Sequence, residues 1–228
     1  MPLAIFDIDG TLVSVSSERL FWRFLLARRR QGFRQIFTYL LFLVRYVWIG
    51  GVHTVKKNKA YLAGLPVDEV EALAKEFVAE RLLEHLHEPA VQRLRQHLAR
   101  GDTVVLMSGT LQPIARALAE HLGVRHVVGT VANERDGRFT GQPPDLHPFD
   151  TAKLTLAREL AAARGLDLAE ATAYGDSRHD LPLLRAVGEP VAVRPDRALA
   201  AEAERCGWEI LPDRVALAFR KAERSPYP

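Results

Sequence analysis

Two acidic residues near the start of the chain carry its strongest chemical signal. An apolar run at residues 3–6 is followed directly by Asp7, an isoleucine, Asp9, Gly10 and Thr11. If the run is a strand, residues two apart share a face, so both carboxylates lie together beyond its carboxyl end. Such carboxylates repel each other unless a cation or a shared proton intervenes. Because Gly10 allows a sharp turn and Thr11 offers a hydroxyl, the segment predicts a site for a divalent metal and a phosphate group.

The same segment has two other interpretations. Aspartate and glycine favour solvated turns for reasons of their own, so the motif alone is also consistent with a turn that binds nothing. A calcium loop is suggested by Glu18, which is the twelfth residue counted from Asp7. We reject the calcium loop, because it needs glycine at its sixth position, where this chain has Leu12, and it follows a helix rather than an extended run.

Three further polar clusters follow predicted strands or open predicted helices. Ser108-Gly109-Thr110 follows the apolar run 103–107 and precedes a helix, where hydroxyl and free N–H groups form an anion site. Lys153 falls in the first turn of a helix, where a cation opposes the helix dipole unless an anion offsets it. Gly-Asp-Ser-Arg-His-Asp at 175–180 adds two acids after a strand. Alone, each cluster is also explained as a helix cap or a surface lysine.

Alternating strands and helices in the second half of the chain predict the framework for these clusters. Short apolar runs are typical of strands, and helical periodicity separates them; the strands are expected at 103–107, 126–128, 171–174 and near 191 and 209, and the helices at 112–122, 152–163 and near 181. Strand-like stretches 130–133 and 138–140 flank Asp136-Gly137, which is a hairpin signal. This alternation predicts an α/β fold, a mostly parallel sheet with helices on both faces and ligands at the carboxyl ends of the strands. Residues 16–88 show helical patterns only.

Composition narrows the function classes. The 228 residues are 48% hydrophobic and 26% charged with a formal charge of +3, as in an ordinary globular protein. No nucleic-acid-binding signature is visible, so we expect no nucleic-acid partner. Cys206 is the one cysteine, which excludes disulfides within the chain and a cysteine-rich metal site. Since no signal peptide is recognisable, we expect a cytoplasmic protein. The eight histidines show no metal-ligand spacing and are interpreted as surface residues.

The order and composition of the four clusters resemble the haloacid dehalogenase superfamily of phosphate hydrolases. The resemblance covers nearly the whole chain, and residues 132–141 are similar to a stretch of the phosphoserine phosphatase branch, subfamily IB. It implies a Rossmann-like core domain at 1–15 and 89–228, with an α-helical cap domain at 16–88 inserted after the first strand.

The resemblance also implies roles for single residues. Asp7 would be the nucleophile that forms an aspartyl-phosphate, Asp9 the general acid and base, and Lys153 the cation that neutralises both phosphate and Asp7. Phosphate contacts would come from Thr11, Ser108, Gly109 and Lys153. Magnesium would be held by Asp7, the backbone carbonyl of Asp9, and Asp176, with Asp180 in its outer shell or holding Lys153.

The substrate is less well indicated than the reaction. Phosphoserine phosphatases place a glutamate early in the cap and an arginine further on, whereas this chain has Ser16 at the first position and Lys57-Asn58-Lys59 near the second. Glu18, Lys59 and His179 are the candidate substrate residues. Phosphoserine, histidinol phosphate and other small phosphomonoesters remain open, as do phosphoryl transfer to another alcohol, a catalytically idle binding or scaffold protein, and any oligomeric state.

Residues 28–49 combine aromatic and apolar side chains with arginines. The apolar core at 33–49 is too short to span a bilayer and is interrupted by Arg45. It is consistent with a buried cap helix, and also with an interfacial helix that touches an anionic membrane or with a pocket for an acyl chain. The second interpretation would give a phosphatase for phospholipid or lysophospholipid phosphates.

Overall fold

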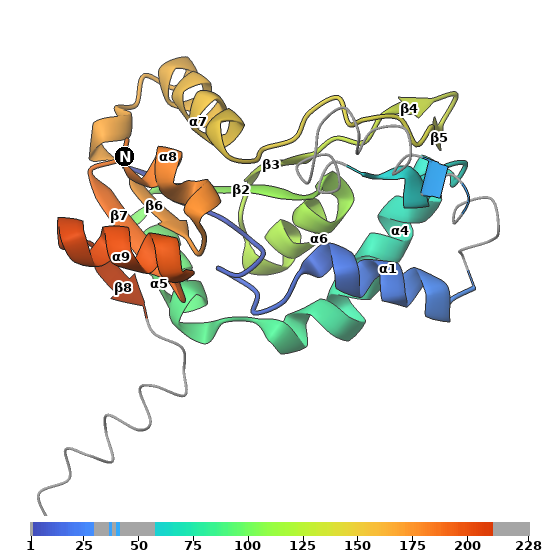
Figure 1. Ribbon diagram of the computed structural model, residues 1–228, viewed down its shortest axis with the longest axis horizontal. Helices are drawn as coiled ribbons and strands as arrows, with labels where there is room; N and C mark the ends of the chain where they lie inside the picture. The colour runs from blue at the N-terminus through green and yellow to red at the C-terminus, as the bar shows by residue number, and fades with distance from the viewer. Residues whose placement is uncertain (1, 30–36, 38–39, 42–57, 212–228) are drawn as a thin grey trace, which may run out of the picture.

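A six-stranded parallel sheet forms the centre of the protein. The computed structural model describes residues 2–29, 37, 40–41 and 58–211, and Figure 1 shows their arrangement. The strands lie in the order β3-β2-β1-β6-β7-β8; they are β1 (Leu3–Phe6), β2 (Thr103–Leu111), β3 (His126–Thr130), β6 (Thr172–Gly175), β7 (Glu189–Val193) and β8 (Glu209–Leu211). Every neighbouring pair is parallel. The predicted α/β class is therefore confirmed.

Helices cover both faces of this sheet. The side chains of Ala4 and Phe6 belong to one hydrophobic cluster, and those of Leu3 and Ile5 to a second, as alternation along a strand requires. The first cluster includes α5 (Glu88–Arg100) and α6 (Gln112–Leu122), and the second includes α7 (Thr151–Ala163), α8 (Leu181–Leu184) and α9 (Arg197–Cys206). Two short 3₁₀ turns, η4 (Leu168–Glu170) and η5 (Arg178–Asp180), precede β6 and α8.

Strand order places the site at one point of the sheet. From β1 the chain continues outward to β2 and β3, then returns to the other side of β1 as β6. In open parallel sheets, ligands bind at the carboxyl ends of the strands where this reversal occurs. Asp7 follows β1, Ser108 lies in β2, and Asp176 follows β6, so three of the predicted clusters meet at this edge.

The segment between β1 and α5 is helical, as predicted. It contains α1 (Ser17–Ala27), η1 (Ala60–Leu62), α4 (Val67–Phe77), a π-helical turn η2 (Val78–Leu82) and η3 (Leu83–His85). The rings of Phe21, Phe24 and Phe77 contact one another at centroid distances of 5.2 to 6.3 Å. These side chains share the hydrophobic cluster of α5 and α6. The described helices of this segment thus pack on the same core as the sheet, and most of residues 28–49 lie outside the described residues.

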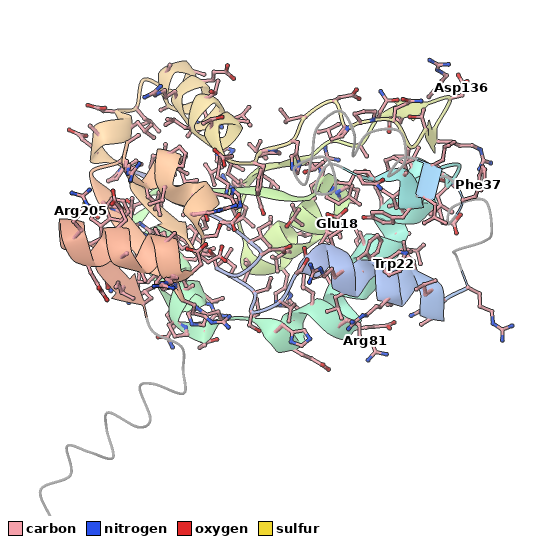
Figure 2. The ribbon with its side chains drawn as sticks, in the orientation of Figure 1. Glu18, Trp22, Phe37, Arg81, Asp136 and Arg205 are labelled. Atoms are coloured by element: carbon pink, nitrogen blue, oxygen red, sulfur yellow. The ribbon has the colours of Figure 1, made fainter. Side chains whose placement is uncertain are left out.

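A hairpin ties the second half of the chain to this helical segment. β4 (Glu134–Arg135) and β5 (Arg138–Phe139) pair across the Asp136-Gly137 turn, which lies at the same end of the molecule as Trp22 (Figure 2). Gly64 N donates to Phe139 O at 2.7 Å, and Phe139 N donates to Leu65 O at 3.1 Å. The predicted turn is confirmed, whereas the predicted strand at 130–133 is wrong. β3 ends at Thr130, and Val131 makes only a bridge to Leu146.

Two further expectations are corrected. Ser108-Gly109-Thr110 lies inside β2, not between a strand and a helix, because β2 continues past a register shift after Met107. The surface interpretation of the histidines is wrong for His87 and His97, which are both buried. His97 hydrogen-bonds the Tyr174 hydroxyl at 2.9 Å and Asp102 at 2.8 Å, so its polar atoms are satisfied within the core. None of the helices in the described part of the chain has the length and apolar character needed to cross a bilayer.

Replacement of Phe139 by alanine tests the hairpin's attachment. Its side chain is 5% exposed and belongs to the cluster shared with the helical segment. Phe139→Ala is expected to lower the free energy of unfolding by about 3 kcal/mol or more, because a large buried side chain is lost. Exposed Arg135 on the partner strand is the control, with an expected change within about 0.5 kcal/mol for Arg135→Ala. Equal urea midpoints for the two variants would contradict this packing.

Candidate active site

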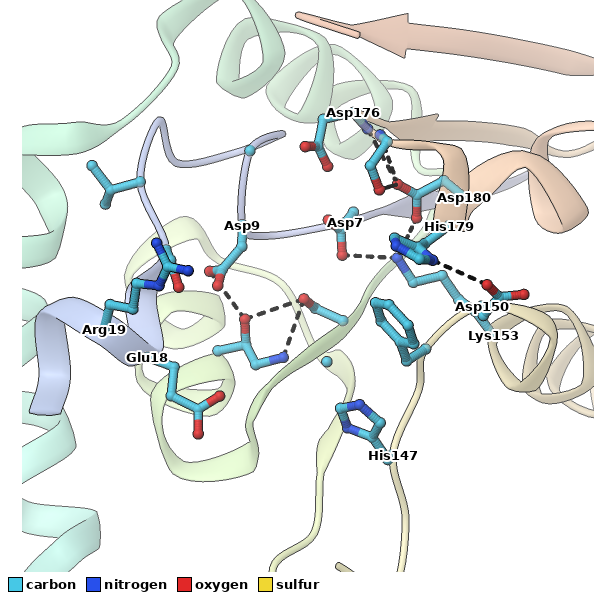
Figure 3. Close-up of a pocket in the computed structure, with 18 of the residues that line it drawn as sticks. Asp7, Asp9, Glu18, Arg19, His147, Asp150, Lys153, Asp176, His179 and Asp180 are labelled. Carbon is cyan, nitrogen blue, oxygen red and sulfur yellow. Dashed lines mark hydrogen bonds and ion pairs between the residues drawn. The ribbon is translucent and has the colours of Figure 1, made fainter. Parts of the chain in front are cut away.

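A cavity of about 730 Å³ opens at the reversal point of the sheet. Figure 3 shows Asp9, Glu18 and Arg19 on one side of it, Asp150, Lys153 and His179 on the other, and Asp7 between them. Side chains from all four predicted clusters therefore line one cavity, although they are separated by up to 173 residues, from Asp7 to Asp180, in the sequence.

Lys153 joins two of these clusters. It is 4% exposed, and its Nζ donates to Asp7 Oδ1 at 2.8 Å and to Asp180 Oδ1 at 2.5 Å. Burial alone would lower the pKa of Lys153, but the charges of Asp180 and Asp7 outweigh this and raise it. Lys153 is therefore a permanent cation whose position is fixed by two carboxylates.

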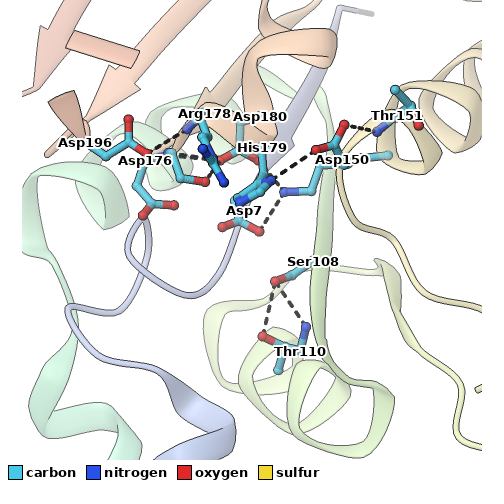
Figure 4. Close-up of polar contacts among 12 residues, drawn as sticks. Asp7, Ser108, Thr110, Asp150, Thr151, Asp176, Arg178, His179, Asp180 and Asp196 are labelled. Atoms are coloured by element: carbon cyan, nitrogen blue, oxygen red, sulfur yellow. Dashed lines mark hydrogen bonds and ion pairs between the residues drawn. The ribbon is translucent and has the colours of Figure 1, made fainter. Parts of the chain in front are cut away.

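Asp180 uses both carboxylate oxygens within the protein. Oδ1 accepts from Lys153, while Oδ2 accepts from the backbone N–H of Asp176 at 3.3 Å and of Ser177 at 3.2 Å. The Ser177 hydroxyl also donates to Oδ2 at 3.2 Å (Figure 4). This arrangement makes Asp180 a positioning residue for Lys153 and for the loop after β6. Of the two roles expected for it, holding Lys153 is the one that its contacts match.

Three carboxylates form a cluster that suits a cation. One oxygen each of Asp7, Asp176 and Asp180 lies within 4.8 Å of the other two. Burial raises the pKa of Asp7, and burial followed by the charge of Asp7 raises the pKa of Asp176 to about 8. A divalent cation would relieve this repulsion, and hard oxygen donors are the ligands such ions prefer.

Gly10 permits the acidic cluster to form. Its φ is +85°, and a Cβ atom at this position would lie 2.1 Å from Asp176 Oδ2. Only glycine fits both constraints, so the turn after β1 can pass directly against the carboxylate that follows β6.

Asp9 lies apart from the acidic cluster. Its Oδ1 accepts from the Ser17 N–H at 3.1 Å and from the Thr110 hydroxyl at 3.2 Å, at the start of α1. Burial is the main reason why the pKa of Asp9 is raised, to about 6. A carboxyl group with that pKa exchanges protons near neutral pH, which suits a general acid and base. Its carboxylate is not part of the cluster of Asp7, Asp176 and Asp180.

The hydroxyl groups beside Asp9 and Asp7 form a buried network. Ser108 Oγ lies 3.1 Å from Thr110 Oγ1, which in turn lies 3.3 Å from Ser17 Oγ. Ser108 and Gly109 line the cavity as expected. Thr11 does not: it is fully buried outside the cavity lining, and its hydroxyl has no hydrogen-bond partner among the described residues. The predicted phosphate contact of Thr11 is therefore not supported by its position.

The candidate substrate residues occupy opposite walls. Lys59 is 1% exposed and donates to both oxygens of Glu18, at 2.7 and 2.5 Å. Glu18 lines the cavity, whereas Lys59 lies behind it. His179 lies on the far wall, where its Nδ1 is 3.0 Å from Asp150 Oδ2. Glu18 and Lys59 are thus brought together, whereas His179 is not.

Several cavity residues were missed by the sequence analysis. His147 and Phe149 come from the loop before α7, and the Phe149 ring lies 4.3 Å from that of His179. Asp150 caps α7 through Thr151 N while adopting a positive φ of 57°. Its position directly before the helix of Lys153 was the available signal, since aspartate is a favoured N-cap. The loop aromatics carry no such local signal.

Comparison with known proteins identifies the family. A family model described as haloacid dehalogenase-like hydrolase matches residues 4–185. The chain belongs to the haloacid dehalogenase-like hydrolase family. The Mycobacterium tuberculosis protein named phosphoserine phosphatase SerB1 is 35% identical to this hydrolase, over 99% of this chain and 74% of that protein. A histidinol-phosphatase of Neisseria meningitidis is 30% identical, over 92% of this chain and 97% of its own length.

Solved structures support the fold of this haloacid dehalogenase-like hydrolase. A Bordetella pertussis protein of unknown function superposes with a TM-score of 0.79 at 30% identity, covering 92% of this chain and 98% of that one. A phosphoserine phosphatase structure described as a phospho-aspartyl intermediate analogue superposes with a TM-score of 0.63 at 20% identity, covering 96% and 98%. The second likeness concerns the fold alone.

The acidic cluster of the hydrolase predicts a pH-dependent stability without metal. The folded chain keeps a proton on Asp176 up to about pH 8, whereas the unfolded chain releases it at the ordinary aspartate pKa of 3.8. The unfolded state thus binds fewer protons between these values, so this group lowers stability as pH rises towards 8 and has no further effect above it. In EDTA, the Tm of the wild type should fall relative to that of Asp176→Asn between about pH 6 and pH 8.5.

Added magnesium chloride should reverse this trend in the wild type and much less in Asp176→Asn. Differential scanning fluorimetry across the pH series measures both effects. A difference in Tm between the two proteins that stays constant with pH and with metal would contradict the cluster's raised pKa.

Proposed function

We propose that this hydrolase is a magnesium-dependent phosphomonoesterase, similar to phosphoserine phosphatase, that acts on a small phosphorylated metabolite through an aspartyl-phosphate. One observation carries the proposal: buried Lys153 binds Asp7 and Asp180 beside a third carboxylate, at the cavity that Ser108 and Asp9 also line. A phosphate dianion repels nucleophiles, and Lys153 would offset that charge beside Asp7, the carboxylate that we propose to attack.

Asp7 is the nucleophile in this proposal. Lys153 holds its Oδ1, which orients the carboxylate at the carboxyl end of β1. Attack on phosphorus forms the aspartyl-phosphate and breaks the bond to the leaving alcohol. Lys153, the Ser108 hydroxyl and the N–H of Gly109 are the proposed contacts for the phosphate oxygens.

Asp9 transfers the protons. In the first step it donates a proton to the leaving alcohol oxygen, and in the second it takes one from the water that attacks the aspartyl-phosphate. The Ser17 N–H and the Thr110 hydroxyl hold its Oδ1 for both steps. Its pKa of about 6 allows it to act as the acid and then as the base near neutral pH.

Asp7 and Asp176 would hold the magnesium ion together with the backbone carbonyl of Asp9, and Asp180 would keep Lys153 in place. The ion supplies charge neutralisation for the phosphate and for the crowded carboxylates. Residues 16–88 would act as the cap that selects the leaving group, since Glu18, Arg19, Trp22 and Asn58 from this segment line the cavity. The relatives named phosphoserine phosphatase and histidinol-phosphatase make both esters candidate substrates.

The nucleophile and the acid can be separated by mutation. Asp7→Asn is expected to abolish turnover of every ester, because no aspartyl-phosphate can form. Asp9→Asn should lower kcat/KM, which reports on the first step, by about 10²- to 10⁴-fold for alkyl phosphates and by less for p-nitrophenyl phosphate, whose leaving group needs little protonation. Steady-state rates measure both effects, and a Tm equal to that of the wild type shows that each variant is folded. Full activity of Asp7→Asn would refute its role as nucleophile, and equal losses of kcat/KM on both ester types would refute the role of Asp9 as general acid.

A second function is favoured by exposed apolar side chains. Five of the seven exposed large hydrophobic residues in the described chain lie between residues 22 and 41, namely Trp22, Leu26, Phe37, Leu40 and Leu41. We propose peripheral contact of this region with anionic membrane, which would suit a phospholipid or lysophospholipid phosphate as substrate. We also propose that the protein is located in the cytoplasm.

Sedimentation with liposomes tests the membrane proposal. Binding to vesicles that contain anionic lipid is expected at low salt, with a weaker association for the double variant Trp22→Ser, Leu26→Ser. Neutral vesicles are the control for the contribution of charge. Absence of the wild type from the pellet at low salt would contradict the proposal and leave the metabolite substrates.

A further inference from the structure

The end of the cavity next to Asp9 is the place where the leaving group is expected. Asp9 donates to the alcohol oxygen in the proposed reaction, and its Oδ1 is bound by Ser17 N at 3.1 Å. The next two residues of α1, Glu18 and Arg19, line the same cavity, and Figure 3 shows both on the side of Asp9. These side chains are therefore placed to contact whatever the alcohol carries.

Glu18 is already neutralised at this end. Both of its carboxylate oxygens accept from Lys59 Nζ, which is 1% exposed, while the Glu18 side chain is 24% exposed. An ammonium group on the substrate would have to share this carboxylate with a buried cation that binds both oxygens. Glu18 thus offers little net charge to the cavity.

Arg19 is a cation without a partner among the described residues. It is exposed at the cavity wall and makes no hydrogen bond or ion pair within the part of the chain that the structure describes. Its guanidinium presents a planar set of donors that matches a carboxylate or a phosphate. When Asp9 carries the proton that it donates in the first proposed step, the net charge at its end of the cavity is therefore positive.

Asn58 adds a donor that has no acceptor in the described part of the chain. Its side chain is 4% exposed and lines the cavity. Oδ1 accepts from Ala60 N at 2.9 Å, which fixes the orientation of the amide, and Nδ2 has no hydrogen-bond partner among the described residues. A buried donor without an acceptor is costly, so an acceptor on the ligand would relieve it.

We propose that Arg19 and Asn58 recognise an oxyanion on the leaving alcohol, so that the preferred substrates are phosphomonoesters of a hydroxy acid or of a second phosphate, not of an amino alcohol. This inference rests on the proposed phosphatase function and specifies its substrate class. Arg19 and Asn58 supply hydrogen-bond donors at this end of the cavity, and Arg19 also supplies a positive charge. The carboxylate of Glu18 is already bound by Lys59. The carboxylates of Asp7, Asp176 and Asp180 form a separate cluster, which is the proposed cation site.

Matched esters test the proposal directly. 3-Phosphonooxypropanoate and phosphoethanolamine carry a carboxylate and an ammonium group, respectively, after the same two methylene groups, and phosphoserine carries both. We expect kcat/KM of the carboxylate ester to exceed that of the ammonium ester by about tenfold or more, and phosphoserine to gain nothing further from its ammonium group. 1,2-Ethanediol bisphosphate carries a second phosphate in place of the carboxylate. Its kcat/KM, compared with that of the carboxylate ester, shows which oxyanion is preferred.

Two variants assign the preference to residues. Arg19→Gln should reduce the ratio of kcat/KM between the carboxylate and ammonium esters by about five- to tenfold. Asn58→Asp keeps the acceptor for Ala60 N, removes the donor and should reduce the ratio further. Arg23→Gln is the control, since Arg23 is an exposed arginine one turn along α1 that does not line the cavity. An unchanged ratio in Arg19→Gln, or a wild-type preference for the ammonium ester, would overturn the proposal.

Binding separates this inference from the phosphatase function itself. In an Asp7→Asn background with magnesium, calorimetry should show tighter binding of the carboxylate ester than of phosphoethanolamine, and the Arg19→Gln double variant should lose that difference. If the wild type hydrolyses no ester, including p-nitrophenyl phosphate, the proposed function fails while this binding result still decides the inference. If the wild type hydrolyses all esters without a charge preference, the function stands and the inference fails.

Discussion

The ion pairs of buried Lys153 are the interaction on which the site depends. Asp7 and Asp180 are both buried, burial raises the pKa of Asp7, and Lys153 Nζ lies 2.8 and 2.5 Å from their carboxylate oxygens. Removing one partner of such a buried set leaves an uncompensated charge, which is far more costly than losing a surface pair. The same contact joins the strand end of β1 to the start of α7 and to the loop after β6. Lys153 therefore balances the charge of these two carboxylates and also holds the three segments together.

The remaining negative charge explains why a cation is expected. Asp7, Asp176 and Asp180 crowd within 4.8 Å of one another, and Gly10 lets the first turn pass against Asp176. Lys153 offsets only part of this charge, and a phosphate ester brings more. Asp9 differs from the other acids because its carboxylate is bound by Ser17 and Thr110. In the proposed mechanism, the first group of carboxylates holds a cation and Asp9 transfers protons.

The sequence predicted the sheet and most of the cluster residues because both depend on local pattern. Alternation along β1 and the four polar clusters are visible in a few residues each, and a parallel sheet brings strand ends to one edge. The limits of β2 and the place of Thr11 could not be predicted, since a register shift and the direction of a buried side chain depend on packing between distant segments. The pairing of Glu18 with Lys59 spans 41 residues and has no local signal.

Trapping of the phosphorylated enzyme tests the central claim most directly. Wild-type protein mixed with magnesium and a substrate ester, then quenched in acid within milliseconds, should carry the mass of one phosphoryl group on the peptide from the start of the chain, and fragmentation should place it on Asp7. Lys153→Met should carry far less under the same conditions, because Asp7 loses its fixed cation. A phosphoryl group on another residue, or hydrolysis without any labelled Asp7 in the wild type, would contradict the account.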